Sequence, residues 1–189
     1  IKNVGGAALD ALIAEREANG AYHSLTDFCT RVDGAKVNRK VIESLIKVGA
    51  FDALNSHRGQ LMAMLDLSME RAKVLLRNRL SGQMSLFALG STAMQAAETA
   101  EVEAPEVDKW PELQRLAFEK ESVGFYLTGH PLESVASELH LITTGDIASL
   151  AHVREGQVVR VGGLVTSYRE HKTKKGDRMA FVVLEDLQN

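Results

Sequence analysis

The sequence IKNVGGAALDALIAEREAN, residues 1–19, joins a glycine pair directly to a segment with helical periodicity. The apolar side chains of this segment recur at intervals of three and four residues, which is the spacing of one face of an α-helix. They are Ala8, Leu9, Leu12 and Ile13. The pattern predicts a helix over residues 6–19, and Gly20 suits the left-handed backbone position that follows a last helical turn.

The junction between the glycines and this helix is suited to binding an anion. The first turn of a helix leaves backbone N–H groups unpaired and carries the positive end of the helix dipole. Side chains at Gly5 and Gly6 would keep a sugar-phosphate backbone away, Lys2 adds a positive charge, and Val4 completes an apolar-x-x-apolar-Gly turn. The local pattern gives equal weight to a phosphate site and to an ordinary loop-to-helix connection.

Two shorter helices and one long helix are expected next. Ser24 precedes an apolar segment with a capping-box pattern, which predicts the start of a short helix. Asn38 is suited to cap a helix over residues 39–48, which Gly49 ends. Apolar residues spaced by three or four predict a long helix from about residue 56 to residue 80.

Basic residues surround the helix that Asn38 is expected to cap. These candidate contacts to a sugar-phosphate backbone are Lys36, Arg39, Lys40 and Lys47. Taken alone, such a set is more typical of a solvated helix face.

The segment LSGQMSLFALGS, residues 80–91, leaves large apolar side chains beside a stretch with linker composition. It can be presented as an extended ligand in which Gln83 bonds main-chain groups while Leu86 and Phe87 fill an apolar pocket on a partner. Burial of each apolar side chain is worth about 1.5–3 kcal/mol before the segment is ordered. Composition alone favours the alternative, in which the segment is a short edge strand or folds back onto the helices.

The rest of the chain changes character twice. Residues 91–108 carry five acidic residues and no basic ones, which predicts a linker. Trp110 and Pro111 then begin a helix whose packed side includes Leu113, Leu116, Ala117 and Lys120, and residues 131–140 are expected to be helical. From Gly156 a period of two predicts a β-hairpin that begins a small barrel.

The expected fold is therefore mainly α-helical, with a partial barrel at the end. The expected divisions are a helical region, a short segment with large apolar residues, a linker, a helical connector and a partial β-hairpin. Their ranges are 1–80, 81–90, 91–109, 110–150 and 151–189. Basic residues beside an aromatic ring at the hairpin tip are candidate contacts to single-stranded DNA, as in other small barrels. They are Tyr168, Arg169, Lys172, Lys174, Lys175 and Arg178.

Composition favours binding over catalysis. The net charge is +3 over residues 1–80, −8 over residues 81–149 and +2 over residues 150–189, so two basic segments flank an acidic one that would repel a polyanion. The single cysteine and the scattered histidines show no metal-ligand spacing, and we expect Cys29 to lie in the core. No catalytic motif is present, so we expect neither catalytic nor metal-binding residues, and no cofactor, in these residues.

The sequence also suggests where the chain works. No apolar run approaches the length of a membrane span and no signal pattern is present, so we expect a cytoplasmic protein without a membrane partner. Because the chain starts at Ile1 and not at methionine, we expect it to be a fragment.

Six stretches occur in an order that resembles the C-terminal half of the bacterial replicative DNA polymerase III alpha subunit family. They are IKNVGGAALDALIAERE, SLTDFCTRVD, VNRKVIESLIKVGAFD, GQMSLF, AFEKESVGFYLTGHPL and GQVVRVGGLVTSYREHKTKKGDRMAFVVLED. The phrase EKESVGFYLTGHPL is the most specific of them, and the resemblance covers nearly the whole chain.

The resemblance implies a role for each region. Residues 1–80 would form a helix-hairpin-helix region that grips duplex DNA, and the segment from about residue 156 would begin an OB domain for the single-stranded template. The internal motif for the sliding clamp, the beta subunit, would be Gln83, Met84, Ser85, Leu86 and Phe87. The chain would tether the polymerase to DNA and clamp for processive replication, with other replicase subunits as possible partners.

Some features depart from the family pattern. Asn3 stands where a glycine would usually open the hairpin, which suggests a less tight turn and a weaker phosphate contact. The parent family consists of DNA-directed DNA polymerases, which are nucleotidyltransferases, but its catalytic aspartates and their Mg²⁺ site would lie outside these residues. The alternatives are an interaction module with the SLF segment buried internally and no clamp role, and a nuclease, which would need clustered carboxylates that the sequence does not offer.

Overall fold

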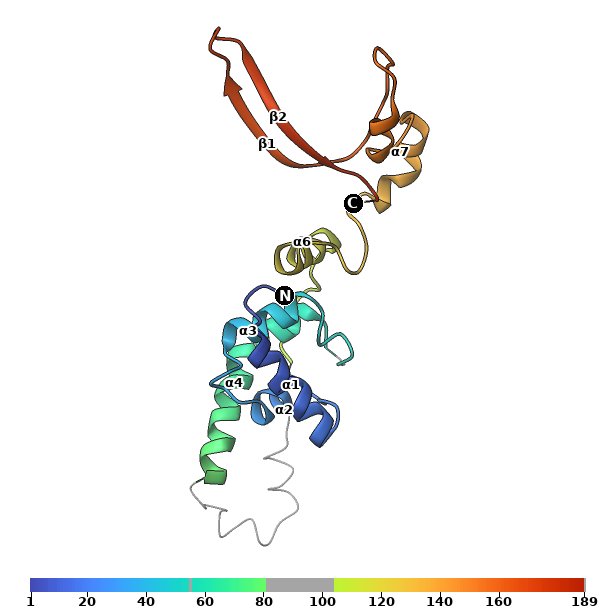
Figure 1. The fold of residues 1–189 in the computed structure, drawn as a ribbon. Coiled ribbons are helices and arrows are strands. Elements are labelled where there is room, and N and C mark those ends of the chain that lie inside the picture. The colour runs from blue at the N-terminus through green and yellow to red at the C-terminus, as the bar shows by residue number, and fades with distance from the viewer. Residues whose placement is uncertain (55, 81–103, 189) are drawn as a thin grey trace. The chain divides into compact units, whose positions relative to one another are not determined.

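The computed structural model describes residues 1–54, 56–80 and 104–188, and Figure 1 traces them. They form two compact units, Ile1–Leu127 and Thr128–Asn189. Most of the regular structure is helical, with one two-stranded sheet near the end of the chain, which confirms the predicted fold class. No helix in these ranges is long and apolar enough to cross a membrane.

Three helices with polar or glycine caps begin the first unit. They are α1 (Gly6–Asn19), α2 (Leu25–Arg31) and α3 (Arg39–Lys47). The Ser24 hydroxyl accepts a hydrogen bond from a backbone N–H in the first turn of α2, and the Asn38 side chain does the same for α3. Both side chains satisfy N–H groups that a helix leaves unpaired, which is why α2 and α3 begin where the sequence predicts.

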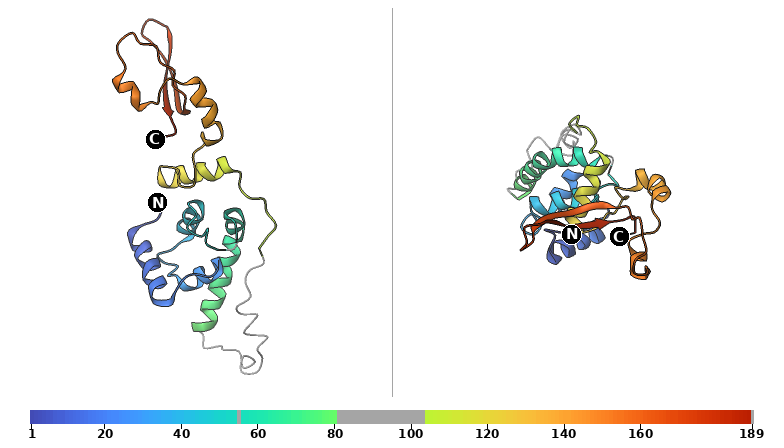
Figure 2. Two further views of the ribbon diagram at one scale, coloured as in Figure 1. Left: turned by 90° about the vertical axis from the view of Figure 1, so that its right-hand side faces the viewer. Right: turned by 90° about the horizontal axis from the view of Figure 1, so that it is seen from above.

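The first unit is completed by α4 (Arg58–Leu80) and α6 (Glu112–Val123). His57 caps the start of α4. Its Nδ1 accepts a hydrogen bond from the Gln60 N–H, and the Gln60 side chain accepts one from the His57 N–H. Figure 2 shows α6 crossing close to the end of α3 and the start of α4. The chain range 104–127 therefore belongs to the same unit as the first four helices.

The core of the first unit lies between α1, α2, α3 and α4. Leu25, Ile46 and Leu65 are almost completely buried there, and Trp110 packs against the edge of this core. The face of α6 differs from the prediction, because Leu113 is 65% exposed while Leu116 and Glu119 are buried. The prediction was wrong about Leu113 and about Ala117, which is also exposed, because a carboxylate and not an apolar side chain completes the packed face.

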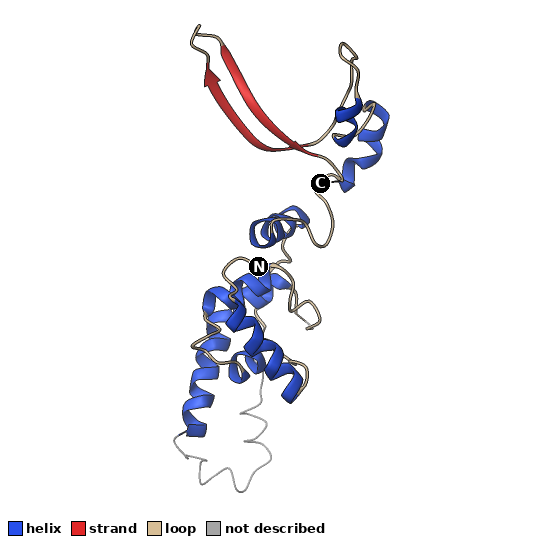
Figure 3. Ribbon diagram, in the orientation of Figure 1, coloured by secondary structure: helices blue, strands red, loops and turns tan. Residues whose placement is uncertain are grey.

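The second unit is smaller and more open. A 3₁₀ turn leads into α7, a second 3₁₀ turn follows, and two antiparallel strands end the described chain (Figure 3). These elements are η1 (Glu133–Val135), α7 (Ala136–Ile142), η2 (Ala148–His152), β1 (Leu164–Lys172) and β2 (Arg178–Glu185). Within the described part of this unit only Leu132 and Asp186 are buried.

The hairpin begins later than its sequence pattern suggests. The period of two starts near Gly156, but β1 starts at Leu164. Arg160 instead pairs with the loop after α7, since the Thr144 N–H donates to its carbonyl at 2.8 Å and its own N–H donates to the Thr144 hydroxyl at 2.9 Å. The boundary between the two units after Leu127 also divides the range 110–150, which the sequence groups as one connector.

Candidate nucleic-acid interface

The N-terminal turn has a left-handed residue at Asn3. Its φ angle is 66°, and asparagine is one of the few residues besides glycine that adopts this region readily. The Asn3 amide also donates a hydrogen bond to the Ser44 hydroxyl of α3 at 3.3 Å. Asparagine thus supplies the backbone conformation that glycine would supply and adds a contact that glycine lacks.

Gly5 and Gly6 border open space. Gly5 caps α1 in an extended conformation, and neither glycine has a positive φ angle. A Cβ atom placed on either glycine would meet no other atom within 4 Å, apart from its chain neighbours and the backbone of α1. The fold of the chain therefore does not require glycine at these positions, whereas a ligand that approaches the start of α1 closely would.

Three of the predicted basic contacts to duplex DNA lie together. Lys2, Lys40 and Lys47 line a pocket of about 180 Å³ between the N-terminal turn, α3 and the end of α6, which we call the lysine pocket. The other lining residues are Asn3, Glu43, Ser44, Glu121 and Ser122. The Lys2 N–H donates to the Ser122 carbonyl at 2.7 Å, so α6 holds the N-terminal turn in place.

The other two basic candidates are held elsewhere. Lys36 lies in the turn before α3, 3.9 Å from the Asp33 carboxylate. Arg39 donates to Asp66 at 2.7 Å and to Glu43 at 3.0 Å, and its hydrogen bond with Asp66 raises the pKa of Arg39. Neither Lys36 nor Arg39 lines the lysine pocket. The role of all five basic residues in duplex binding stays a prediction.

A buried ion cluster fixes the walls of this pocket, and the sequence analysis did not single it out. Arg58 is 6% exposed and Glu119 is fully buried, and the two are joined at 2.7 Å. Arg58 also bonds Asp52 at 2.6 Å and the Lys47 carbonyl at 3.2 Å. The second Glu119 oxygen accepts the Leu127 N–H at 2.8 Å. The cluster thereby connects the end of α3, the start of α4, and α6 with the segment that follows it.

One sequence signal could have revealed the cluster, and the structure adds a second mark of it at Gly49. Glu119 follows Leu116 at an interval of three, so a carboxylate occupies an apolar position of the α6 pattern. Gly49 has a φ angle of 82°, and a Cβ atom there would overlap the Arg58 guanidinium. Because hydrogen bonding to Asp52 outweighs its burial, the pKa of Arg58 is raised and the side chain stays charged.

The predicted single-strand contacts divide between the two faces of the hairpin. Tyr168 pairs with Val182 and Lys172 pairs with Arg178, so these side chains share one face, whereas Arg169 pairs with Phe181 on the other. Lys174 and Lys175 lie in the turn between the strands. The Tyr168 hydroxyl donates to Glu170 at 3.0 Å, and its ring is largely exposed.

Phe181 is an exposed aromatic ring that the sequence analysis did not select. It is 57% exposed and lies beside Arg169, on the face opposite Tyr168. Strand register was the missing information, because a period of two alone does not say which residues of the facing strand lie opposite. Each face of the hairpin therefore offers at least one aromatic ring and at least one basic residue.

The predicted clamp motif, Gln83 to Phe87, lies outside the described residues. Residues 91–103, which make up most of the expected linker 91–109, also lie outside the described residues. The extended-ligand interpretation and its alternative, internal burial, therefore both stay predictions.

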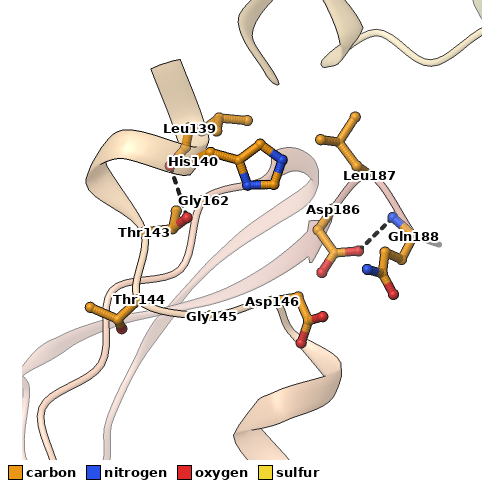
Figure 4. A pocket seen from close by; sticks show the side chains of 10 residues that line it. All are labelled: Leu139, His140, Thr143, Thr144, Gly145, Asp146, Gly162, Asp186, Leu187 and Gln188. Carbon is orange, nitrogen blue, oxygen red and sulfur yellow. Dashed lines mark hydrogen bonds between the residues drawn. The ribbon is translucent and has the colours of Figure 1, made fainter. Parts of the chain in front are cut away.

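The second unit contains a pocket of about 350 Å³, shown in Figure 4. Its two carboxylates already serve the backbone: Asp186 accepts the N–H groups of Ile147 and Gln188, and Asp146 accepts that of Ser149. Across the described ranges no three His, Cys, Asp or Glu side chains gather as a metal site. The carboxylates of this pocket therefore stabilise turns.

Comparison with known proteins gives a consistent result. The Helix-hairpin-helix motif matches residues 1–61. The DNA polymerase III subunit alpha of Vibrio cholerae is 37% identical over 186 residues, or 98% of this chain, and that of Haemophilus influenzae is 36% identical over the same length. The Escherichia coli K12 subunit is 35% identical over 187 residues.

The alignments cover nearly all of this chain but only a small part of each relative. The chain spans about 16% of the length of each of these relatives, while 98% of the chain is aligned. The resemblance stated from the sequence is confirmed, both for the subunit and for the helix-hairpin-helix region at its start.

Proposed function

We propose that this chain, which is similar to a segment of DNA polymerase III alpha subunits, holds duplex DNA and the sliding clamp for a replicative polymerase. The reaction itself would be carried out by other parts of a longer polypeptide, since the relatives are about six times as long as this chain. The observation that carries the proposal is the N-terminal turn, where a glycine-capped helix and three lysines lie together within the same unit as the matched helix-hairpin-helix motif.

The geometry suits contacts to the DNA backbone and not to base edges. Open space in front of Gly5 and Gly6 admits a phosphate to the unpaired N–H groups at the start of α1. Lysine side chains are point charges that neutralise phosphates without reading sequence. Such a surface would follow the duplex behind a moving polymerase regardless of its sequence.

Duplex binding tests this part of the proposal. Affinity for a short duplex, measured by fluorescence anisotropy at increasing NaCl, should fall linearly on a log–log plot, with a slope of about −0.9 per phosphate neutralised. Affinities for unrelated sequences should agree. Binding that is insensitive to salt, or strongly selective for one sequence, would contradict the proposal.

The clamp contact is supported by the resemblance alone, since GQMSLF lies outside the described residues. A pair of buried apolar side chains gives an affinity on the order of micromolar after the cost of ordering the segment. Tethering to DNA through the same chain would raise the effective concentration of the motif.

Titration with a purified bacterial sliding clamp tests the clamp contact. The double variant Leu86→Ala and Phe87→Ala should lose clamp binding and keep the unfolding transition of the first unit. Loss of the fold in that variant would favour internal burial of the SLF segment over the clamp role.

A further inference from the structure

Glu43 lies at the centre of the basic residues of α3. One of its carboxylate oxygens accepts a hydrogen bond from Arg39 at 3.0 Å, and the other lies 3.3 Å from the Lys47 ammonium. The three residues are spaced by four along the helix, so they form a ladder on one face. The Glu43 side chain is only 29% exposed.

The same carboxylate lines the lysine pocket. Lys2, Lys40 and Lys47 contribute three positive charges to its lining, and Glu43 and Glu121 contribute two negative ones. The lining therefore carries a net charge of +1 with Glu43 present and would carry +2 without it. One acidic residue thus decides much of the attraction between this pocket and an anion.

Lys47 keeps its place independently of Glu43. Its ammonium lies 4.9 Å from the centre of the Phe118 ring, and this cation–π contact positions it at the wall formed by α6. Arg39 has a second carboxylate partner in Asp66 at 2.7 Å. Removal of the Glu43 charge would therefore leave both cations in position, while only Lys47 becomes available to the pocket.

We propose that Glu43 is the internal counter-ion of the lysine pocket and competes with a DNA backbone phosphate for Lys47. This inference rests on the proposed duplex binding and adds a regulator to it. A phosphate that enters the pocket must displace the carboxylate from Lys47. Glu43 thereby limits sequence-independent affinity, so that a duplex held here exchanges phosphate contacts readily as it moves.

The pocket is also more than a helix-hairpin-helix feature. Glu121 and Ser122 form one of its walls, and both lie well beyond the matched range 1–61. The Lys2 N–H is bonded to the Ser122 carbonyl, so this wall and the N-terminal turn keep a fixed spacing. A phosphate subsite built in this way depends on α6 as well as on the hairpin.

The test compares Glu43→Gln with Glu70→Gln in the 189-residue chain. Each variant removes one negative charge, so the two change the net charge equally. Glu70 pairs with Lys73 on the exposed face of α4 and does not line the pocket, so its variant controls for the change in net charge alone. Affinity for a short mixed-sequence duplex is measured across a NaCl series. Glu43→Gln should bind about three- to tenfold more tightly at low salt, with a log–log slope steeper by up to about one, while Glu70→Gln stays near the wild type.

A second variant makes the result specific to Lys47. In a Lys47→Gln background the gain from Glu43→Gln should largely disappear, since the competing cation is gone. Equal affinities for Glu43→Gln and Glu70→Gln, or a gain that survives without Lys47, would overturn the inference and leave the proposed duplex binding intact. A wild-type chain that shows no salt-dependent duplex binding would overturn both.

Discussion

The lysine pocket of the first unit and the hairpin tip of the second unit carry similar basic side chains on very different supports. The pocket is framed by α3 and α6, which are fixed by the Arg58 cluster and by the packed core next to it. The hairpin holds its basic residues by strand register alone, and most side chains on both its faces are exposed. An isolated two-stranded hairpin is only marginally stable in water.

The basic side chains of the two regions are therefore held in place in different ways. In the first unit, the buried Arg58–Glu119 pair and the packed core fix the helices that carry the lysines, so the frame of the pocket is in place before a ligand arrives. In the second unit, the positions of Tyr168 and Phe181 depend on a ladder that opens at low cost. We therefore expect changes in the first unit to act through stability and geometry, and changes in the hairpin to act locally.

Thiol reactivity should show the largest contrast between the two regions. Burial raises the pKa of the Cys29 thiol to about 12, which leaves little thiolate near neutral pH. A cysteine introduced in place of exposed Ser167 in β1 has no such protection. In the Ser167→Cys variant, Cys29 should react with a thiol reagent more than about a thousandfold more slowly than the introduced thiol in β1.

Both rates are followed by mass spectrometry of the same molecule at mildly alkaline pH. The wild type, which contains only Cys29, serves as the control for reagent access to the core. Comparable rates at the two positions would show that the core around α2 opens as readily as the hairpin.

Removal of Arg58 should give the next largest effect. Arg58→Ala takes the guanidinium away from the buried Glu119 carboxylate, which costs about 3–5 kcal/mol of unfolding free energy. The matched exposed change, Lys73→Ala, removes only a surface pair with Glu70 and should cost less than about 0.5 kcal/mol.

Trp110, the only tryptophan of the chain, packs against the core of the first unit and reports its urea unfolding by fluorescence. Similar losses in the two variants would mean that the buried cluster adds no more than a surface pair does.

Substitutions in the hairpin should have smaller effects, on the affinity for single-stranded DNA. If a base stacks on Tyr168, the change Tyr168→Ala weakens binding of an oligonucleotide by about 1–3 kcal/mol and leaves duplex binding unchanged. Phe181→Ala, on the opposite face, reports whether bases use that face instead. Anisotropy titrations with single-stranded and duplex DNA make the comparison. An equal loss for both forms of DNA would contradict separate roles for the two regions.

The smallest expected effect concerns the surface pair between Arg39 and Asp66. The hydrogen bond from Arg39 lowers the pKa of Asp66 from its ordinary value of 3.8. A lowered folded-state pKa contributes stability that is present above the unfolded value and is lost as pH falls through the folded one. The advantage of the wild type over Asp66→Asn in unfolding free energy should therefore shrink as the pH falls below 3.8.

Arg39→Gln provides the control, because it removes the cause of the shift. The difference in unfolding free energy between Arg39→Gln and the double variant with Asp66→Asn should change little over the same pH range. A pH dependence that persists without Arg39 would show that another group lowers the pKa of Asp66.

Local sequence rules predicted the elements that local interactions fix. Ser24 and Asn38 begin their helices as expected, because a cap needs only a side chain and a nearby N–H group. Gly49 follows the end of α3 in the left-handed conformation, which glycine adopts without steric cost. The apolar periodicity of residues 6–19 and 58–80 likewise needs no information from distant residues.

The features that depend on contacts between distant residues could not be predicted from the sequence. Glu119 meets Arg58 across 61 positions of the chain, and no local pattern says which cation will reach a buried carboxylate. The start of β1 depends on whether Arg160 pairs with a strand or with Thr144, which periodicity cannot decide. Lys2 and Lys47 were selected for their charge, but the wall of α6 that brings them into one pocket was not foreseen.

The most direct test of duplex binding at the lysine pocket is the salt dependence of the double variant Lys40→Gln and Lys47→Gln. Each lysine that neutralises a phosphate adds about one unit to the log–log slope of duplex affinity against NaCl. We expect the variant to bind more weakly, with a slope reduced by up to about two and an unchanged unfolding transition at Trp110. An unchanged slope in a folded double variant would contradict duplex binding at the lysine pocket.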